Sequence, residues 1–182
     1  MRFYTPCLIA VAILFTACGQ VQDLPAPELL SPIPERMTEA HRVAWDVMAS
    51  SSILTLITLD EDGQPQARIL DATAPDSARF DVWMGTNVNS AKVREIRANP
   101  RATIMYRIPD SQGYVTLRGR AEIVDDPALK ENYWRPSWAP FYPDREAMFI
   151  LIHFTPFDGE VVSFTHGLMG DPLTWAAPEF GF

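Results

Sequence analysis

Three strand-like segments precede the first helix embedded among them, and this order limits the folds open to the chain. Residues 53–59 are rich in β-branched side chains, Asp60-Glu61-Asp62-Gly63 is a turn signal, and residues 66–73 form the second arm of a predicted hairpin. Apolar residues alternate from Phe80 to Met84, which predicts a third strand. This order argues against the alternating strands and helices of a Rossmann fold and favours an antiparallel, mainly β domain.

Residues 86–106 predict a strand end, a polar turn, a short helix and a return strand. Asn89 or Ser90 is the expected N-cap, and Pro100 ends the helix because the residue before a proline is pushed out of the α region. On spacing alone, a capped surface helix between two strands is the simpler interpretation. The turn also has the groups of an anion site, namely the backbone N–H groups of a helix start, the charge of Lys92, and small hydrogen-bonding side chains: Thr86, Asn87, Asn89 and Ser90.

The remaining segments complete an antiparallel sheet with short helices. An amphipathic helix is predicted at residues 37–48, where apolar residues recur three and four apart. Asp126 followed by Pro127 predicts the start of another short helix. The remaining strands are expected at residues 101–107, 114–124, 148–155 and 160–165, with Pro156 and Gly159 separating the last two. The predicted fold class is therefore mainly β, an antiparallel split barrel of six to seven strands and Greek-key type.

The motif T-N-x-x-S-x-K, followed by an apolar-patterned helix and N-P-R-A-T, resembles the core motif of the pyridoxamine 5'-phosphate oxidase-like family of FMN-binding split barrels, which includes general-stress-protein-like members. The resemblance implies that Thr86, Ser90 and Lys92 hold the FMN phosphate and ribityl chain, with Gly85 beside them. It covers residues 36–165 and implies a homodimer with FMN at the interface.

Other positions match the same family. Arg68-Ile69-Leu70 resembles the family's R-x-(V/L)-L strand, which implies that Arg68 binds the flavin phosphate and that the backbone of Ile69 and Leu70 runs along the ring. From the residues alone, the alternative is that Arg68 is a solvated edge residue or one half of a structural ion pair. Tyr114 stands where the family oxidase has a glutamine and is expected to contact the flavin. Trp175, near the C-terminus, is expected to approach the flavin of the other subunit.

The resemblance leaves the activity open. The Arg and His pair that the oxidase uses for its substrate has no match, and Thr73 stands in place of its substrate-binding lysine. The expected function is an FMN-dependent oxidoreductase of unknown substrate, which exchanges a hydride with a small-molecule electron donor or acceptor. The alternative is a non-catalytic module of the same fold that binds a deazaflavin, haem or a hydrophobic ligand. No residue is identified as a catalytic acid or base.

Export is expected from the start of the chain. Residues 1–17 resemble a bacterial lipoprotein signal peptide, because an apolar run ends in Thr16-Ala17-Cys18-Gly19. Cys18 is then the lipidated residue, residues 18–35 are a proline-rich tether, 36–165 the FMN-binding domain and 166–182 a C-terminal tail. The expected location is the bacterial cell envelope. Ordinary cleavage or an uncleaved anchor is the alternative.

Charge and cysteine content narrow the possible partners. The chain has 15 basic and 23 acidic residues, a net charge of −8, which disfavours nucleic acid and anionic membrane surfaces as partners. A membrane would be reached through the lipid alone. Cys7 and Cys18 are the two cysteines, and both precede the domain, so neither thiol chemistry nor a thiolate metal site is expected there. The three histidines show no metal-ligand spacing.

Overall fold

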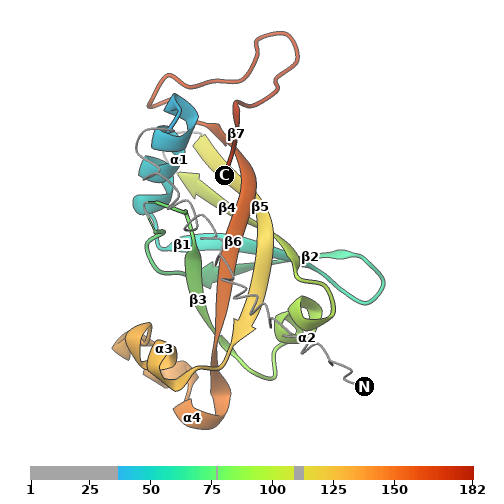
Figure 1. Ribbon diagram of the computed structural model, residues 1–182, viewed down its shortest axis with the longest axis vertical. Coiled ribbons are helices and arrows are strands. Elements are labelled where there is room, and N and C mark those ends of the chain that lie inside the picture. Colours follow the sequence, from blue (N-terminus) through green and yellow to red (C-terminus); the bar gives the residue numbers. More distant parts are fainter. Residues whose placement is uncertain (1–36, 77, 109–112) are drawn as a thin grey trace, which may run out of the picture. The chain divides into compact units, whose positions relative to one another are not determined.

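The computed structural model describes residues 37–76, 78–108 and 113–182 (Figure 1). The predicted signal peptide, Cys18 and the tether lie outside these ranges. The elements are, in chain order, α1 (Glu39–Ala49), β1 (Ile53–Leu59), β2 (Pro65–Asp71), β3 (Val82–Asn87), α2 (Ala91–Ala98), β4 (Arg101–Ile108), β5 (Gly113–Val124), α3 (Pro127–Asn132), the 3₁₀ helix η2 (Pro136–Phe141), α4 (Arg145–Met148), β6 (Phe149–Val162) and β7 (Glu179–Gly181).

The strands form one seven-stranded sheet in the order β2-β1-β4-β5-β6-β3, with β7 paired to β6. Every pairing is antiparallel. The strands at the two ends of this order meet at an isolated bridge between Ala72 and Met84, which closes the sheet into a barrel. The predicted mainly β, antiparallel fold is therefore confirmed. Figure 1 shows α1 and β7 at one end of the barrel and α2, α3 and α4 at the other.

The predicted hairpin of β1 and β2 forms with the expected turn. The carboxylate of Asp60 accepts hydrogen bonds from the backbone N–H groups of Asp62 and Gln64, at 3.0 and 2.8 Å. Gly63 has φ +76°, a conformation that glycine adopts without steric cost. This turn sets the register in which Leu56 lies opposite Arg68, and so it fixes the position of Arg68 relative to β1.

The loop between β2 and β3 corrects the predicted third strand. Phe80 was expected inside that strand, but it precedes β3 and has φ +60°, a strained conformation for a bulky residue. Its ring is fully buried and makes edge or tilted contacts with rings from α1 and the C-terminus: His41, Trp45, Phe180 and Phe182. Burial of this large ring stabilises a backbone conformation that local preference disfavours.

The last long strand is also a correction, because β6 is continuous where two strands were predicted. It runs through Pro156 and Gly159, the two residues expected to separate them. Pro156 lies opposite Gly119, where the pairing of β5 with β6 shifts register. A proline, which has no N–H to donate, is tolerated at such an irregularity. A Cβ on Gly119 would clash with the carbonyl oxygen of Thr155, so this position requires glycine.

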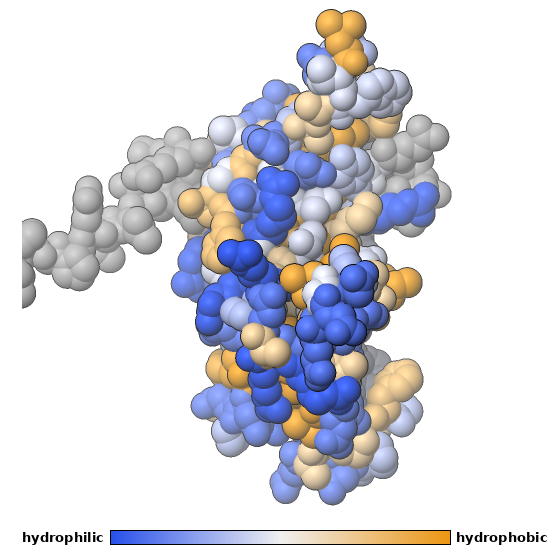
Figure 2. Space-filling model, turned by 90° about the vertical axis from the view of Figure 1, so that its right-hand side faces the viewer, coloured by the Kyte–Doolittle hydropathy of each residue, from blue (hydrophilic) through white to orange (hydrophobic). Residues whose placement is uncertain are grey.

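The C-terminal residues belong to the barrel, a feature that the weak periodicity of the tail did not predict. Strand β7 pairs with β6, and the carbonyl of Gly181 is 3.0 Å from Nε2 of His41 on α1. Between β6 and β7 the chain carries exposed apolar residues, with Leu173 at 90% and Trp175 at 85% exposure. Figure 2 shows apolar surface at the top of the molecule, where Figure 1 draws this segment.

A second, aromatic cluster lies at the α3–α4 end, around Trp138, Phe149 and Leu151. Asp71 at the end of β2 holds it to the barrel, since its carboxylate accepts hydrogen bonds from Nη1 of Arg135 at 2.7 Å and from the indole of Trp138 at 2.9 Å. Within the described ranges, no helix has both the length and the apolar character needed to cross a membrane.

Candidate cofactor site

Three of the predicted FMN-binding residues meet where β3 ends and α2 begins. Nζ of Lys92 donates a hydrogen bond to Oγ1 of Thr86 at 3.0 Å, and the hydroxyls of Thr86 and Ser90 lie 3.3 Å apart. Thr86 is buried, at 3% exposure. The three side chains therefore form one compact polar group, which we call the β3–α2 cluster.

Local sequence explains this arrangement. The turn after β3 is held by hydrogen bonds from the backbone N–H groups of Asn89 to Oδ1 of Asn87 (2.9 Å) and of Ser90 to the carbonyl of Asn87 (3.0 Å). Ser90 stands at the N-cap of α2, as predicted, but its hydroxyl makes no capping hydrogen bond to the helix. The hydroxyl points to Thr86 instead, and the start of α2 keeps its partial positive charge without a capping side chain.

Arg68 reaches the same region from β2 and makes an ion pair there. Its Nη2 lies 2.9 Å from Oε2 of Glu95 on α2, and its Nη1 donates to the hydroxyl of Thr58 on β1. That hydroxyl donates in turn to Oε2 of Glu95. The ion-pair alternative considered for Arg68 is thus what the structure shows, beside the cluster to which the resemblance assigns it.

The electrostatics of Lys92 connect the two groups. Burial lowers the pKa of Lys92 below its ordinary value, the positive charge of Arg68 lowers it further, and Glu95 raises it in part. Two cations and one carboxylate therefore share a partly buried space, with a net charge of +1 while Lys92 is protonated. An anion bound beside Lys92 would favour its charged form.

The other predicted residues on β2 and β3 have different surroundings. Ile69 points away from Arg68, because neighbours on a strand face opposite sides, and it is 72% exposed. Leu70 packs against the barrel core. Gly85 faces the aromatic cluster, and a Cβ there would lie 2.7 Å from ring atoms of both Trp138 and Phe149. In the single chain, Gly85 therefore allows the rings of Trp138 and Phe149 to pack closely against β3.

Tyr114 and Trp175 lie outside the β3–α2 cluster in the single chain. Tyr114 is near the start of β5, opposite Arg107 and Val162, and its neighbour Glu160 adds to the effect of burial in raising its pKa. Trp175 is in the exposed segment before β7 and has φ +61°. The roles implied for these two residues by the resemblance stay predictions.

Sequence reasoning missed two residues of the site, Thr58 and Glu95. Glu95 follows Lys92 by three positions on α2, a spacing that puts both side chains on one face of a helix, so the pattern was readable. Thr58 lies within an apolar strand, at 1% exposure, and nothing local marks it. Its place beside Arg68 depends on how β1 pairs with β2.

Comparison with known proteins identifies the family. A family model described as pyridoxamine 5'-phosphate oxidase matches residues 37–163, which is most of the chain. The chain therefore belongs to the pyridoxamine 5'-phosphate oxidase family.

Individual relatives match part of their length. The chain is 38% identical over 101 residues to a pyridoxine/pyridoxamine 5'-phosphate oxidase of Cupriavidus necator, covering 56% of this chain and 45% of the relative. It is 35% identical over 82 residues to the enzyme of the same name from Ectopseudomonas mendocina, covering 45% of this chain and 37% of the relative. The chain thus spans less than half the length of these curated relatives.

Solved structures share the fold. A Clostridium acetobutylicum protein related to general stress protein 26 of Bacillus subtilis superposes with a TM-score of 0.65 at 20% identity, covering 78% of this chain and 94% of that one. A haem-binding protein from Mycobacterium smegmatis gives a TM-score of 0.58 at 18% identity, covering 80% and 59%. At these identities the likeness concerns the fold alone.

Proposed function

We propose that the protein is an FMN-binding flavoprotein that works as an oxidoreductase on a small-molecule electron donor or acceptor. The observation that carries the proposal is the pairing of Lys92 with Thr86, 3.0 Å apart and partly buried, at the uncapped start of α2. Membership in the pyridoxamine 5'-phosphate oxidase family supports the same cofactor. The substrate stays open, because the matched relatives are covered over less than half their length.

The donor set suits a phosphate monoester. Such a group has a charge of about −1.5 to −2 at neutral pH and accepts several hydrogen bonds. Lys92 would contribute a point charge, and the hydroxyls of Thr86 and Ser90 two further donors. Arg68 is the second cation of the region, and its ion pair with Glu95 orients the guanidinium. Burial of Lys92 strengthens its attraction for an anion because water screens the charge less.

The protein's own contribution would be binding and orientation. FMN, when bound, supplies hydride transfer at its ring. The β3–α2 cluster and Arg68 would fix the phosphate, and with it the position of the ring relative to β2. We propose a homodimer with the flavin between the subunits, which gives Tyr114 and the exposed Trp175 a place near the cofactor that they lack in one chain.

Haem is less well supported than FMN, although one protein of the same fold binds it. Two of the three histidines have a ring nitrogen in a hydrogen bond, and the third packs by stacking. His41 lies 3.0 Å from the carbonyl of Gly181, His153 stacks on Trp83, and His166 lies 2.8 Å from the hydroxyl of Ser163. None of these contacts belongs to the β3–α2 cluster. A deazaflavin or a hydrophobic ligand stays the alternative to FMN.

We further propose that Cys18 is lipidated and that the domain works at the surface of a bacterial membrane, in the cell envelope. The support is the apolar run that ends in Thr16-Ala17-Cys18-Gly19. Metabolic labelling with palmitate tests this proposal. The wild-type protein should acquire the label and the C18A variant should not.

An absorbance titration of the purified protein with FMN tests the cofactor. A perturbed flavin spectrum that saturates at one FMN per chain is the expected result. A protein that leaves the spectrum of FMN unchanged would contradict the proposal. A Soret band in the protein as purified would point to haem instead. Reduction of the bound flavin by a nicotinamide or another donor would then distinguish an enzyme from a binding module.

A further inference from the structure

A cavity of about 410 Å³ lies between the C-terminal end of α2 and β5. This volume is within the range of small-molecule sites. Part of its lining is apolar, from Ile96, Pro100 and Ile123, and two cations line it as well, Arg97 on α2 and Arg120 on β5. The cavity therefore offers a ligand both apolar surface and positive charge.

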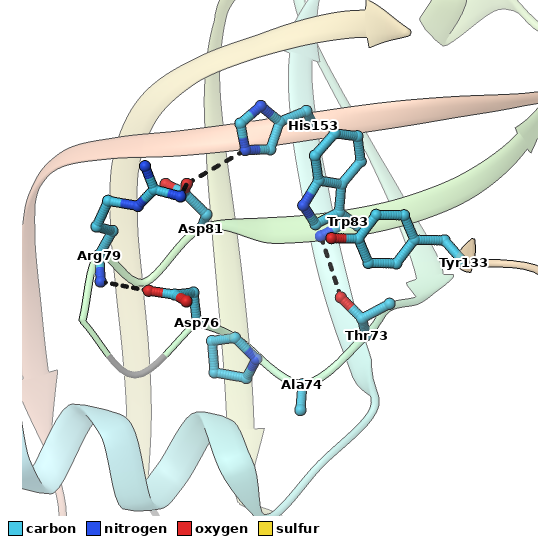
Figure 3. A pocket seen from close by; sticks show the side chains of 9 residues that line it. Thr73, Ala74, Asp76, Arg79, Asp81, Trp83, Tyr133 and His153 are labelled. Carbon is cyan, nitrogen blue, oxygen red and sulfur yellow. Dashed lines mark hydrogen bonds and ion pairs between the residues drawn. The ribbon is translucent and has the colours of Figure 1, made fainter. Parts of the chain in front are cut away.

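This cavity is separate from the other sites of the barrel. The β3–α2 cluster is at the opposite end of α2, because Lys92 lies in the first turn of that helix and Arg97 in the last. Glu122 lines the cavity from β5. Its cross-strand neighbour His153 on β6 belongs to a different pocket, where it stacks on Trp83 (Figure 3). The two pockets have no lining residue in common.

Two arginines beside the cavity are directly opposite each other, Arg101 on β4 and Arg120 on β5. Both point outward, since their neighbours Ala102 and Ala121 are buried. The backbone N–H of Ala121 donates to the carbonyl of Pro100 at 2.8 Å. The next pair along, Arg101 with Arg120, is therefore of the non-hydrogen-bonded kind, in which side chains approach each other most closely. Like charges in this position repel each other.

The fold does not supply Arg101 with an acidic partner. Arg118, the neighbouring outward arginine on β5, pairs with Asp158 and Glu179. Arg120 has one carboxylate 3.1 Å away. Arg101 is exposed and makes no ion pair with any residue that the structure describes. Its charge is thus available to an anion from outside the chain.

Positive charge exceeds negative charge around the cavity, although the whole protein has a net charge of −8. Two acidic residues line the cavity, and both are already paired, Glu122 with Arg120 at 3.1 Å and Asp125 with Lys130 at 2.9 Å. Against these two carboxylates stand four cations, which gives a local net charge of +2. The four cations are Arg97, Arg101, Arg120 and Lys130. Such a local excess attracts anions.

We propose that this cavity binds a small organic dianion, whose charged groups pair with Arg97, Arg101 and Arg120 and whose carbon skeleton lies against the apolar part of the lining. Guanidinium groups suit such a ligand, because their planar N–H forks match the paired oxygens of carboxylate and phosphate groups. A ligand with two negative charges also relieves the repulsion between Arg101 and Arg120. The site does not depend on the flavin.

Isothermal titration calorimetry of the full chain at low ionic strength, with three matched ligands, tests the charge selectivity. Phthalate, which has two negative charges at neutral pH, should bind about fivefold more tightly than benzoate, which has one. Benzamide, which is uncharged, should bind least. Absence of phthalate binding up to about 10 mM would overturn the proposal. Binding of benzamide as tight as that of phthalate would overturn it as well.

Arg101→Gln tests the role of the cross-strand arginine. This variant should weaken phthalate binding about fivefold, because one cation of the site is lost. Its thermal transition should stay near that of the wild type, since Arg101 has no ion pair to lose. Arg94→Gln is the matched control, because Arg94 is an exposed cation of α2 that lines a different cavity. Equal losses of affinity in the two variants would overturn the proposal, since only overall charge would then matter.

Lys92→Ala shows where phthalate binds. The proposal expects this variant to bind phthalate within about twofold of the wild type, because Lys92 lies at the other end of α2. Loss of phthalate binding in Lys92→Ala, with retention in Arg101→Gln, would overturn the proposal, since it would place the anion at the β3–α2 cluster. These titrations contain no FMN, so their outcome is independent of whether the flavin binds.

Discussion

Nη2 of Arg68 lies 2.9 Å from Oε2 of Glu95, and both side chains are mostly buried, at 21% and 10% exposure. This ion pair joins β2 to α2. Because Lys92 is on the same face of α2 as Glu95, the carboxylate lies beside the proposed phosphate site. Glu95 therefore has two opposed effects, since it orients Arg68 and it also places a negative charge near a bound anion.

The first prediction concerns Glu95→Gln. Removal of this charge should lower the stability of the protein by about 1 kcal/mol, because the ion pair with Arg68 becomes a hydrogen bond from the guanidinium to an uncharged acceptor. The same variant should bind FMN roughly fivefold more tightly, since the phosphate no longer faces a carboxylate. Urea denaturation and an FMN titration measure the two effects.

Glu122→Gln is the matched control for Glu95→Gln. Its partner Arg120 is 3.1 Å away, but both side chains are more than half exposed, so neither stability nor FMN affinity should change measurably. A Glu95→Gln variant that binds FMN more weakly than the wild type would show that orientation of Arg68 outweighs repulsion. Failure of the wild type to bind FMN would instead reject the proposed cofactor.

The second prediction concerns Lys92→Ala, which should weaken FMN binding by about 1.5–3 kcal/mol because a charge-assisted contact with the phosphate is lost. Arg94→Ala, an exposed cation two positions further along α2, should leave the affinity near that of the wild type. Quenching of flavin fluorescence measures the FMN affinity of both variants. Equal losses in the two variants would indicate a diffuse effect of charge and no specific phosphate contact.

The candidate site could be predicted as far as its parts are local in sequence. Thr86, Ser90 and Lys92 lie within one turn and the start of one helix, and the structure places the three side chains in mutual contact. Arg68 was assigned to the same region through resemblance. Its partner Thr58 was missed, because that contact depends on the pairing of β1 with β2, and strand pairing is not a local property.

The third prediction tests the role of Gly85 in packing. Gly85→Ala should destabilise the protein by about 1–3 kcal/mol, because the new methyl group would lie 2.7 Å from rings of Trp138 and Phe149. Gly181→Ala is the control, since a Cβ there meets only a carbonyl oxygen at 4.0 Å. Thermal unfolding measures the stability of the two variants. Similar transition temperatures would mean that the aromatic cluster rearranges without loss of stability, and this would contradict the prediction.

The fourth prediction concerns acid stability. Burial alone would raise the pKa of Asp71, but hydrogen bonds from Trp138 and Arg135 outweigh burial and hold the pKa below its ordinary value of 3.8. Asp71 therefore contributes stability above pH 3.8 that is lost as the pH falls through the lowered pKa. Urea denaturation at several acidic pH values should show a shallower decline for Asp71→Asn than for the wild type. Parallel pH profiles would contradict this role.

The fold was predictable in class, and the misses have a shared physical reason. Phe80 was assigned to a strand from its alternation with Val82, but tertiary burial of its ring holds a left-handed backbone conformation. The sequence also predicts a strand end at Pro156, yet an irregularity opposite Gly119 accommodates the proline within β6. Strand β7 has no pattern of its own and forms on the edge that β6 offers. In each case a distant contact overrides the local signal.

A comparison of FMN with riboflavin tests the central claim most directly, because the two ligands differ in the phosphate alone. Calorimetric titrations of the wild type and Lys92→Ala measure both affinities. FMN should bind the wild type at least about tenfold more tightly than riboflavin, and this preference should shrink in Lys92→Ala. Equal affinities for the two flavins, or a preference for FMN that survives the loss of Lys92, would contradict a phosphate site at the β3–α2 cluster.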